Sequence, residues 1–466
     1  MVCGLKNFFD NTFVSLKNTV HITYCALSEF LGALTLRDVI AYLFNVLFKG
    51  KRLYSLSVFL CLYLYFSYLY MQIGTFLRLE NLHNLSFVSS HLCVILAFIS
   101  LVRMLVCKSY KCFISALAIL LCTFISYTKV PQFRLLFEVA CLSVMCFGVS
   151  HKIILKAFLF SVGLLFVATN VLMLTGTLPD LVYFVHKEGI SFYRHSFGMV
   201  YPTDYAAEML FLCLTLFCLL KKTYFFISVG VLALLIYFQI LFTHTRNTEF
   251  VMGLSIIFFV FYVMWQRISL FPKGGFIRGV YKFLAVGMFP FCAILTISLA
   301  IVYDGNVVWM NSLNSLISDR LAISHNMYNL HGISLFGHEI PLVGNGSTVV
   351  SMGDYNFLDI TYVQLLIKFG MVSLLLFAFT YMLTQYRAIN NNCYSVSMCF
   401  ILVCIHSCIE HHYIEPCYNP FILLIFADFK SKENSVLSIF TQSFHQLFVQ
   451  VRKRVTVNCG IPFPTK

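Results

Sequence analysis

Apolar runs of roughly 17 to 25 residues recur along almost the whole chain, and they constrain its fold more than any other feature. Such runs cross a bilayer when they are helical, because a helix satisfies its own backbone hydrogen bonds in lipid. Only 11% of the 466 residues are charged and 60% are hydrophobic, whereas soluble domains carry about 25% charged residues. The sequence therefore predicts an all-α, polytopic integral membrane protein.

The apolar runs predict about twelve transmembrane helices. They lie at 53–76, 86–106, 112–128, 135–150, 157–178, 203–220, 223–243, 250–265, 283–303, 359–385, 393–409 and 413–429. We therefore divide the chain into a cytoplasmic or interfacial N-terminal segment (1–52), a transmembrane bundle (53–303), a large extracytoplasmic loop (304–358), C-terminal transmembrane helices (359–429) and a basic cytoplasmic tail (430–466). Within the first segment, 22–48 is expected to form an interfacial helix.

Basic residues outside the runs predict the orientation, because Lys and Arg favour the cytoplasmic side of a membrane. They alternate correctly with the spans, at Lys108, Lys111, Lys152, Lys156, Lys221, Lys222, Arg267, Lys273, Arg278, Lys282, Arg387 and in the tail. We therefore expect both termini to be cytoplasmic. The net charge of +13 is concentrated in these loops and the tail, which favours contact with anionic membrane lipid and not with nucleic acid.

The 18 cysteines do not indicate a disulfide framework, since most lie inside apolar runs and behave as small hydrophobic residues. No CxxC pair or zinc spacing is present in the sequence. No glycine-rich phosphate loop follows a strand pattern, and no polar segment is long enough for a nucleotide-binding domain. We therefore predict no metal and no cofactor.

The predicted outer side holds one long segment, residues 304–358, in which amphipathic stretches alternate with Gly and Asn. Long connections in compact proteins are usually functional or disordered. Leu335, Phe336, Ile340 and Leu342 provide apolar side chains for packing, so we expect this segment to fold over the outer face. No internal repeat is visible, which disfavours inverted-repeat transporters.

Three arginines, Arg194, Arg246 and Arg320, fall in outer segments and so depart from the positive-inside pattern. A guanidinium at the outer surface is well suited to bind phosphate or diphosphate. The alternatives are a snorkelling side chain for Arg194, a solvated turn for Arg246 and an ordinary surface pair with Asp319 for Arg320.

Each arginine lies among other polar candidates. Arg194 is followed by His195 and a Gly198 to Pro202 turn, and Arg246 lies in the compact island Thr243–Glu249, which includes His244 and Asn247. Downstream of Arg320 come His331, His338, Asp359 and Tyr362. Asp359 opens an apolar run from the outer side, where it either caps the helix or acts as a general base.

A further cluster, Glu410-His411-His412, precedes Glu415 and Asn419 near the end of the apolar region. His411 and Glu415 would share a helical face, so a metal site is conceivable. No established zinc pattern matches, and structural hydrogen bonding between the last spans is the favoured interpretation.

In chain order, these motifs resemble those of the Wzy-type polysaccharide polymerases of capsule, exopolysaccharide and O-antigen systems, which are relatives of the O-antigen ligases. The resemblance covers about residues 50–430 as a pattern of spans and about 190–420 as motifs. The motifs are Arg194-His195-Ser196-Phe197-Gly198 with Tyr201-Pro202, Thr245-Arg246-Asn247-Thr248, Arg320-Leu321, Leu335-Phe336-Gly337, Leu358-Asp359 with Tyr362 and Gly370, and Glu410-His411 with Asn419.

The resemblance implies a metal-independent, GT-C-like membrane glycosyltransferase that needs no cofactor. It would act at the outer face of the bacterial cytoplasmic membrane on an undecaprenyl-diphosphate-linked oligosaccharide, moving the growing glycan onto a new lipid-linked unit. A flippase and a chain-length regulator would be its pathway partners.

The resemblance also implies roles for individual residues. Arg194, Arg246 and Arg320 would be the catalytic arginines. Ligase relatives carry a histidine where this chain has Asp359, so Asp359 is the candidate base and His331 and His338 are the alternatives. The predicted substrate-binding residues are His195, His244, Asn247, His331, His338, Tyr362, Glu410 and His411.

Two other functions remain open from the sequence. A lipid-linked oligosaccharide flippase or other transporter would also have about twelve spans, although it should show internal symmetry and more charges near mid-bilayer. A ligase that passes finished glycan to the envelope would use the same donor and the same leaving group.

Overall fold

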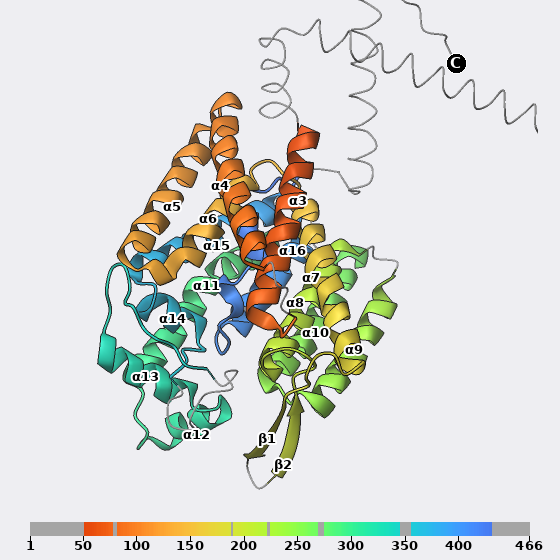
Figure 1. Cartoon of the computed structure of the whole chain (residues 1–466), viewed down its shortest axis with the longest axis vertical. Helices are drawn as coiled ribbons and strands as arrows, with labels where there is room; N and C mark the ends of the chain where they lie inside the picture. The colour runs from red at the N-terminus through yellow and green to blue at the C-terminus, as the bar shows by residue number, and fades with distance from the viewer. Residues whose placement is uncertain are drawn as a thin grey trace, which may run out of the picture. The chain divides into compact units, whose positions relative to one another are not determined.

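The computed structural model describes residues 51–77, 82–187, 190–220, 224–268, 275–344 and 356–430, which are mostly helical (Figure 1). All described residues from Ser57 onward belong to one compact unit. The predicted interfacial helix at 22–48 and the tail beyond Lys430 lie outside the described residues.

The first half of the described chain runs from α3 to α8. Its elements are α3 (Lys51–Leu69), the π turn η2 (Tyr70–Gly74), α4 (Leu82–Val106), α5 (Tyr110–Lys129), η3 (Pro131–Phe133), α6 (Arg134–Met145), α7 (His151–Leu174), β1 (Val182–Lys187), β2 (Ile190–His195) and α8 (Pro202–Leu219). The second half runs from α9 to the last 3-10 turn. Its elements are α9 (Phe225–Phe242), α10 (Arg246–Ile268), α11 (Phe276–Val302), α12 (Val308–Leu316), α13 (Arg320–His331), α14 (Thr361–Ile367), α15 (Met371–Asn390), α16 (Tyr394–His406), η5 (His412–Ile414) and η6 (Pro420–Phe426).

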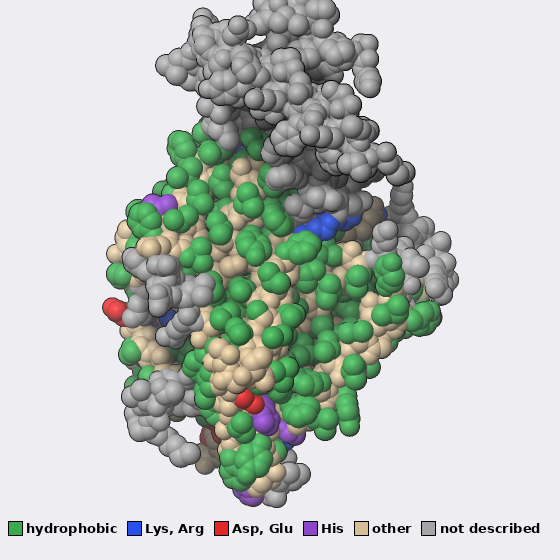
Figure 2. Space-filling model, turned by 45° about the vertical axis from the view of Figure 1, so that its right-hand side comes forward, with side chains coloured by type: hydrophobic (Ala, Val, Ile, Leu, Met, Phe, Trp, Pro, Cys, Tyr) green, Lys and Arg blue, Asp and Glu red, His purple; other side chains and the backbone are tan. Residues whose placement is uncertain are grey.

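Eight helices of the described chain are long and apolar enough to cross a membrane: α3 with η2, α4, α5, α7, α8, α10, α11 and α15. The helices α9 and α16 are apolar but shorter. Hydrophobic side chains cover most of the described surface visible in Figure 2. A water-soluble fold would bury such surface, so this pattern fits helices that face lipid.

The predicted span at 359–385 is two helices, α14 and α15. Gly370 separates them with a φ of +90°, a conformation that only glycine adopts without strain. Its backbone packs on Gly337, which also has a positive φ of 88°, so no side chain fits between the two segments. The close contact between Gly337 and Gly370 therefore separates α14 from α15, although the apolar run across 359–385 is continuous.

The predicted span at 413–429 is not an α-helix. Pro416 and Pro420 interrupt it, and the chain forms two short 3-10 segments that are buried throughout. Asn419 holds this irregular backbone, since its side chain accepts a hydrogen bond from Phe421 N at 3.2 Å and donates one to Tyr413 O at 2.8 Å. Irregular backbone at membrane depth is tolerated when protein surrounds it in this way.

The described part of the 304–358 segment folds against the bundle. Leu321 and Met327 of α13, together with Ile340 and Leu358, join a buried cluster with residues of α11 and α14. Of the side chains expected to provide packing, Ile340 and Leu342 do so, whereas Leu335 is exposed. The segment is thus anchored to the bundle by its own apolar face.

The connection between α7 and α8 forms a two-stranded antiparallel hairpin that the sequence reasoning did not predict. Tyr183 pairs with Arg194 and Val185 with Phe192. Asp180 fixes the base of the hairpin by accepting hydrogen bonds from Ser196 N and Phe197 N at 3.0 and 2.8 Å. Figure 1 shows the hairpin, α12 and α13 at one end of the unit and the α4–α5 turn at the other.

A candidate site lined by arginine, histidine and carboxylate side chains

A cavity of about 1230 Å³ lies between the hairpin, the α9–α10 turn, the α12–α13 segment and the chain that follows α16. Charged and polar side chains from these segments line it, and many of them are predicted site residues. They are Arg194, Asp204, His244, Thr245, Arg246, Asn247, Ser318, Arg320, Asp359, Glu410, His411 and Glu415. The three arginines that depart from the predicted charge pattern therefore line one cavity.

Arg194 and Arg246 contribute a basic wall. Arg194 donates from Nε to Thr243 O at 2.8 Å, and its guanidinium lies 5.6 Å from the centroid of the Tyr201 ring. Arg246 is exposed at the first position of α10. The hairpin thus brings Arg194 to the turn that carries Arg246, although 52 positions separate the two in the sequence.

The α9–α10 turn is tight. His244 adopts a φ of +47°, and its ring packs on Phe192 with the centroids 4.4 Å apart. Partial burial and the charge of Arg194 lower the pKa of His244, which favours the neutral imidazole. Asn247 donates to His406 O at 3.2 Å and so ties the turn to the end of α16.

Arg320 lies between two carboxylates. Its Nε is 3.2 Å from Asp359 Oδ2, and its Nη1 is 2.9 Å from Glu410 Oε1 and 2.8 Å from Ile409 O. The three side chains are only 14%, 9% and 4% exposed. Asp359 thus pairs with Arg320 at the cavity wall, in the stretch just before α14.

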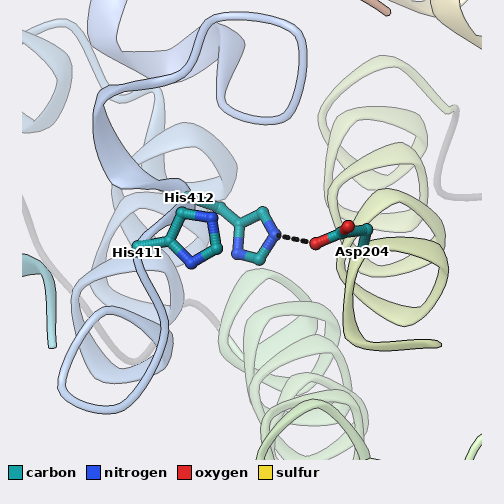
Figure 3. A group of neighbouring side chains, drawn as sticks. All are labelled: Asp204, His411 and His412. Atoms are coloured by element: carbon teal, nitrogen blue, oxygen red, sulfur yellow. Dashed lines mark hydrogen bonds and ion pairs between the residues drawn. The ribbon is translucent and has the colours of Figure 1, made fainter. Parts of the chain in front are cut away.

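Asp359 and Glu410 form an acidic wall of the cavity, and two histidines lie next to it. His411 Nδ1 lies 3.7 Å from Asp359 Oδ1, and His411 Nε2 lies 4.0 Å from Glu415 Oε1. His412, which is fully buried, has its Nε2 3.2 Å from Asp204 Oδ1 (Figure 3). The two imidazole rings stack with centroids 4.2 Å apart.

The pKa values of His411 and His412 are shifted in opposite directions. Burial alone would lower the pKa of His411, but the neighbouring carboxylates of Asp359, Glu415 and Asp204 raise it to about 9. Burial and the neighbouring positive charges lower the pKa of His412 well below its usual value. One wall of the cavity therefore carries the guanidinium groups of Arg194 and Arg246, and the other carries carboxylates and the His411 imidazole.

Four predicted site residues do not line the cavity. His195 pairs with Asp180 at 2.6 Å, so it supports the hairpin. Tyr362 is fully buried and donates to Cys404 O at 2.9 Å. The rings of His331 and His338 lie beside each other, 6.0 Å apart, away from the lining. Long-range packing, which local motifs do not report, directs these side chains elsewhere.

Sequence reasoning assigned no role to Asp204 or Asp180, and it gave His412 only a structural place in the Glu410-His411-His412 cluster. Asp204 stands inside the motif that follows Arg194, and His412 follows His411 directly. The available signal was a carboxylate in the first turn of an apolar helix, where a charge is costly unless it is paired. Its partner lies 208 positions away, which explains why the pairing escaped prediction.

No protein-family model, curated protein or solved structure matches the chain. The fold and the composition themselves define the class: the chain is an all-α, multi-pass membrane protein. Chemically, its cavity combines guanidinium groups that can hold an anion with carboxylates and imidazoles that can take up a proton.

Proposed function

We propose that this protein is a membrane glycosyltransferase that polymerises undecaprenyl-diphosphate-linked oligosaccharide repeat units. The growing glycan leaves its lipid diphosphate and is joined to a sugar hydroxyl of a new lipid-linked unit. The observation that carries the proposal is the shared cavity, in which Arg194, Arg246 and Arg320 meet Asp359. A site for this reaction needs an anion clamp next to a proton acceptor, and both are present in the lining.

The basic wall suits the leaving group. When the bond between the sugar C1 and the phosphate oxygen breaks, negative charge develops on that oxygen, and a guanidinium already in place stabilises it. Arg194 and Arg246, with the amide of Asn247, are the groups we assign to the diphosphate. Arg320 shares its charge with Asp359 and Glu410, so its role is to position these carboxylates.

The acidic wall suits the incoming hydroxyl. As the new bond from its oxygen to C1 forms, its proton passes to Asp359, which we assign as the general base. Lipid diphosphate is a good leaving group, so a carboxylate is a sufficient base. His331 and His338 lie outside the lining, which favours Asp359 over these two alternatives.

We also propose a membrane topology for the chain. About twelve spans, with 304–358 as a large outer loop and both termini cytoplasmic, would place the cavity at the outer face of the bacterial cytoplasmic membrane in a GT-C-like arrangement. There the substrate would arrive after flipping, so a flippase and a chain-length regulator of the pathway are the expected partners.

The test uses purified protein in detergent with lipid-linked repeat units, and the products are sized on a gel. Arg246→Ala is expected to lower polymer formation by about 10² to 10³, the usual effect of removing one charge-stabilising donor. Lys129→Ala, which removes an exposed positive charge outside the cavity lining, is the matched control. Normal chain length with Arg246→Ala would overturn the proposal.

The same assay separates the alternatives. A flippase would move lipid-linked units across proteoliposome membranes without lengthening the glycan. A ligase would consume lipid-linked glycan only when an envelope acceptor is supplied. Polymer formed from lipid-linked units alone is the outcome that only the proposed activity predicts.

A further inference from the structure

We propose that Asp204, His411 and His412 form a binding site for a divalent first-row metal ion, with Zn²⁺ as the best match. The proposal does not rest on the proposed function. It departs from the sequence prediction of no metal, because it depends on a contact between the start of α8 and the chain after α16 that the sequence does not reveal.

The donor atoms are already gathered. One ligand atom from each of the three residues lies within 4.8 Å of the others. Asp204 Oδ1 and His412 Nε2 are 3.2 Å apart. Zinc bonds of about 2.0 to 2.2 Å in a tetrahedral site place neighbouring donors roughly 3.3 Å apart. This pair therefore has the separation of two zinc ligands, and a ligand atom of His411 lies within 4.8 Å of both.

The donor set is also chemically suitable. Two imidazoles and one carboxylate, with a fourth position left to water or substrate, are a ligand set that zinc takes in open sites. His412 is fully buried, whereas Asp204 and His411 line the cavity. Figure 3 shows the His412 ring directed at Asp204 with the His411 ring beside it. The open position would thus face the cavity.

The surroundings favour a cation. Glu208, one turn beyond Asp204 on α8, is fully buried, and neither of its carboxylate oxygens has a hydrogen-bond partner among the described residues. Glu415 Oε2 is likewise buried without a hydrogen-bond partner in the described chain. A buried carboxylate oxygen without a hydrogen-bond partner is costly, and a divalent ion nearby would offset that cost.

Carboxylates that could orient His411 are present as well. Histidine ligands usually present their second ring nitrogen to a carboxylate, which fixes the ring. His411 Nδ1 faces Asp359 at 3.7 Å and His411 Nε2 faces Glu415 at 4.0 Å. Whichever nitrogen binds the ion, the other therefore has a carboxylate nearby.

A second group, Asp359, Glu410 and His411, has a similar spacing. Here Arg320 already contacts both carboxylates, at 3.2 and 2.9 Å. A guanidinium between two ligands repels a metal ion and occupies its place. Within the described chain no guanidinium contacts Asp204 or His412, which contact each other, so the geometry points to the first group.

The experiment measures metal binding directly. The full-length protein, purified in detergent and stripped with chelator, is titrated with Zn²⁺ by calorimetry, and bound metal is counted by elemental analysis. Co²⁺ is then used as a spectroscopic probe, because its visible absorption reports a tetrahedral N/O ligand set. We expect saturable binding of one ion per chain and a tetrahedral Co²⁺ spectrum.

Asp204→Asn and His411→Ala are expected to weaken binding by more than about 100-fold, since losing even a group that only orients a ligand costs about 10 to 100-fold. Asp204→Asn retains a side-chain oxygen beside His412 and so protects the fold. His331→Ala, the same change outside the cavity lining, is the matched control and should leave affinity unchanged. The proposal is wrong if the unaltered protein shows no saturable binding, or if binding survives both ligand variants. Either result stands apart from the polymerisation assay.

Discussion

At the scale of single residues, the three arginines differ in how their charge is compensated. Arg320 is largely buried and contacts Asp359 and Glu410, whereas Arg246 is exposed at the start of α10. Breaking a buried ion pair leaves a charge in a low-dielectric setting, but removing an exposed charge does not. Arg320 should therefore matter for stability as well as activity, and Arg246 chiefly for activity.

Arg320→Ala is expected to lower the free energy of unfolding by about 3 to 5 kcal/mol, because it leaves two buried carboxylates without their shared partner. Thermal unfolding in detergent measures the change. Arg246→Ala serves as the control and should stay within about 0.5 kcal/mol of the unaltered protein. Equal destabilisation by both substitutions would contradict the distinction drawn between them.

Asp359→Asn tests the assigned base. The substitution keeps the shape and one acceptor oxygen for Arg320 but lowers the affinity for a proton, so the maximal rate of polymerisation should fall by about 10² to 10³ with little change in KM. Steady-state rates with lipid-linked units as substrate measure this. Turnover that stays intact would show that Asp359 only holds Arg320 in place.

At the scale of elements, the site depends on irregular backbone between regular helices. The α14–α15 junction is one such place, since Gly337 and Gly370 approach each other with positive φ angles of 88° and 90°. This contact joins the segment that precedes α14 to the bundle and so supports the backbone that carries Asp359. The hairpin is another, because Asp180 anchors the strand that presents Arg194.

Gly370→Ala should destabilise the protein by at least about 1 to 3 kcal/mol, the cost of holding a residue with a side chain in a rare backbone conformation. A Cβ at position 370 would also lie 2.6 Å from Leu335 O, which forces a shift. Gly287→Ala, inside α11 with open space around it, is the control and should be neutral or stabilising. The unfolding temperatures of the two variants measure the difference. An unchanged unfolding temperature for Gly370→Ala would contradict the claim that the close contact at Gly370 requires glycine.

At the scale of the whole molecule, the hairpin, α12 and α13 lie at the end of the helical unit opposite the α4–α5 turn (Figure 1). Residues of these three elements line the cavity. If the helices cross a membrane as proposed, these ends face opposite compartments. Cys107 in that turn is the one exposed cysteine of the described chain. Asn306, between α11 and α12, is exposed at the cavity end.

A membrane-impermeant thiol reagent tests this orientation in intact cells. We expect Asn306→Cys to be labelled from outside, and Cys107 to be labelled only after the cells are permeabilised, because basic loops favour the cytoplasm. The unaltered chain is the control for labelling at Asn306. Labelling of Cys107 in intact cells would reverse the proposed topology.

Prediction from the sequence succeeded where the signal is local. The class of protein follows from long apolar runs, because every backbone group in lipid must be satisfied within its own helix. Arg194, Arg246, Arg320 and Asp359 were chosen since charges in outer segments or at helix entrances need a reason, and all four line the cavity. The break at Gly370 was missed, because hydropathy does not report backbone geometry, and 413–429 was predicted as a span although it carries Pro416 and Pro420.

The sequence by itself thus determined an all-α membrane protein and which charged residues were unusual. Only the tertiary structure decided which of them meet. Arg320 and Glu410 are 90 positions apart, and Asp204 and His412 are 208 apart. Hydrophobic periodicity says which segments form helices, but it carries almost no information on which helix ends pack together, since that depends on side-chain packing across the whole bundle. For the same reason His195 and Tyr362, chosen on equal sequence grounds, lie outside the cavity lining.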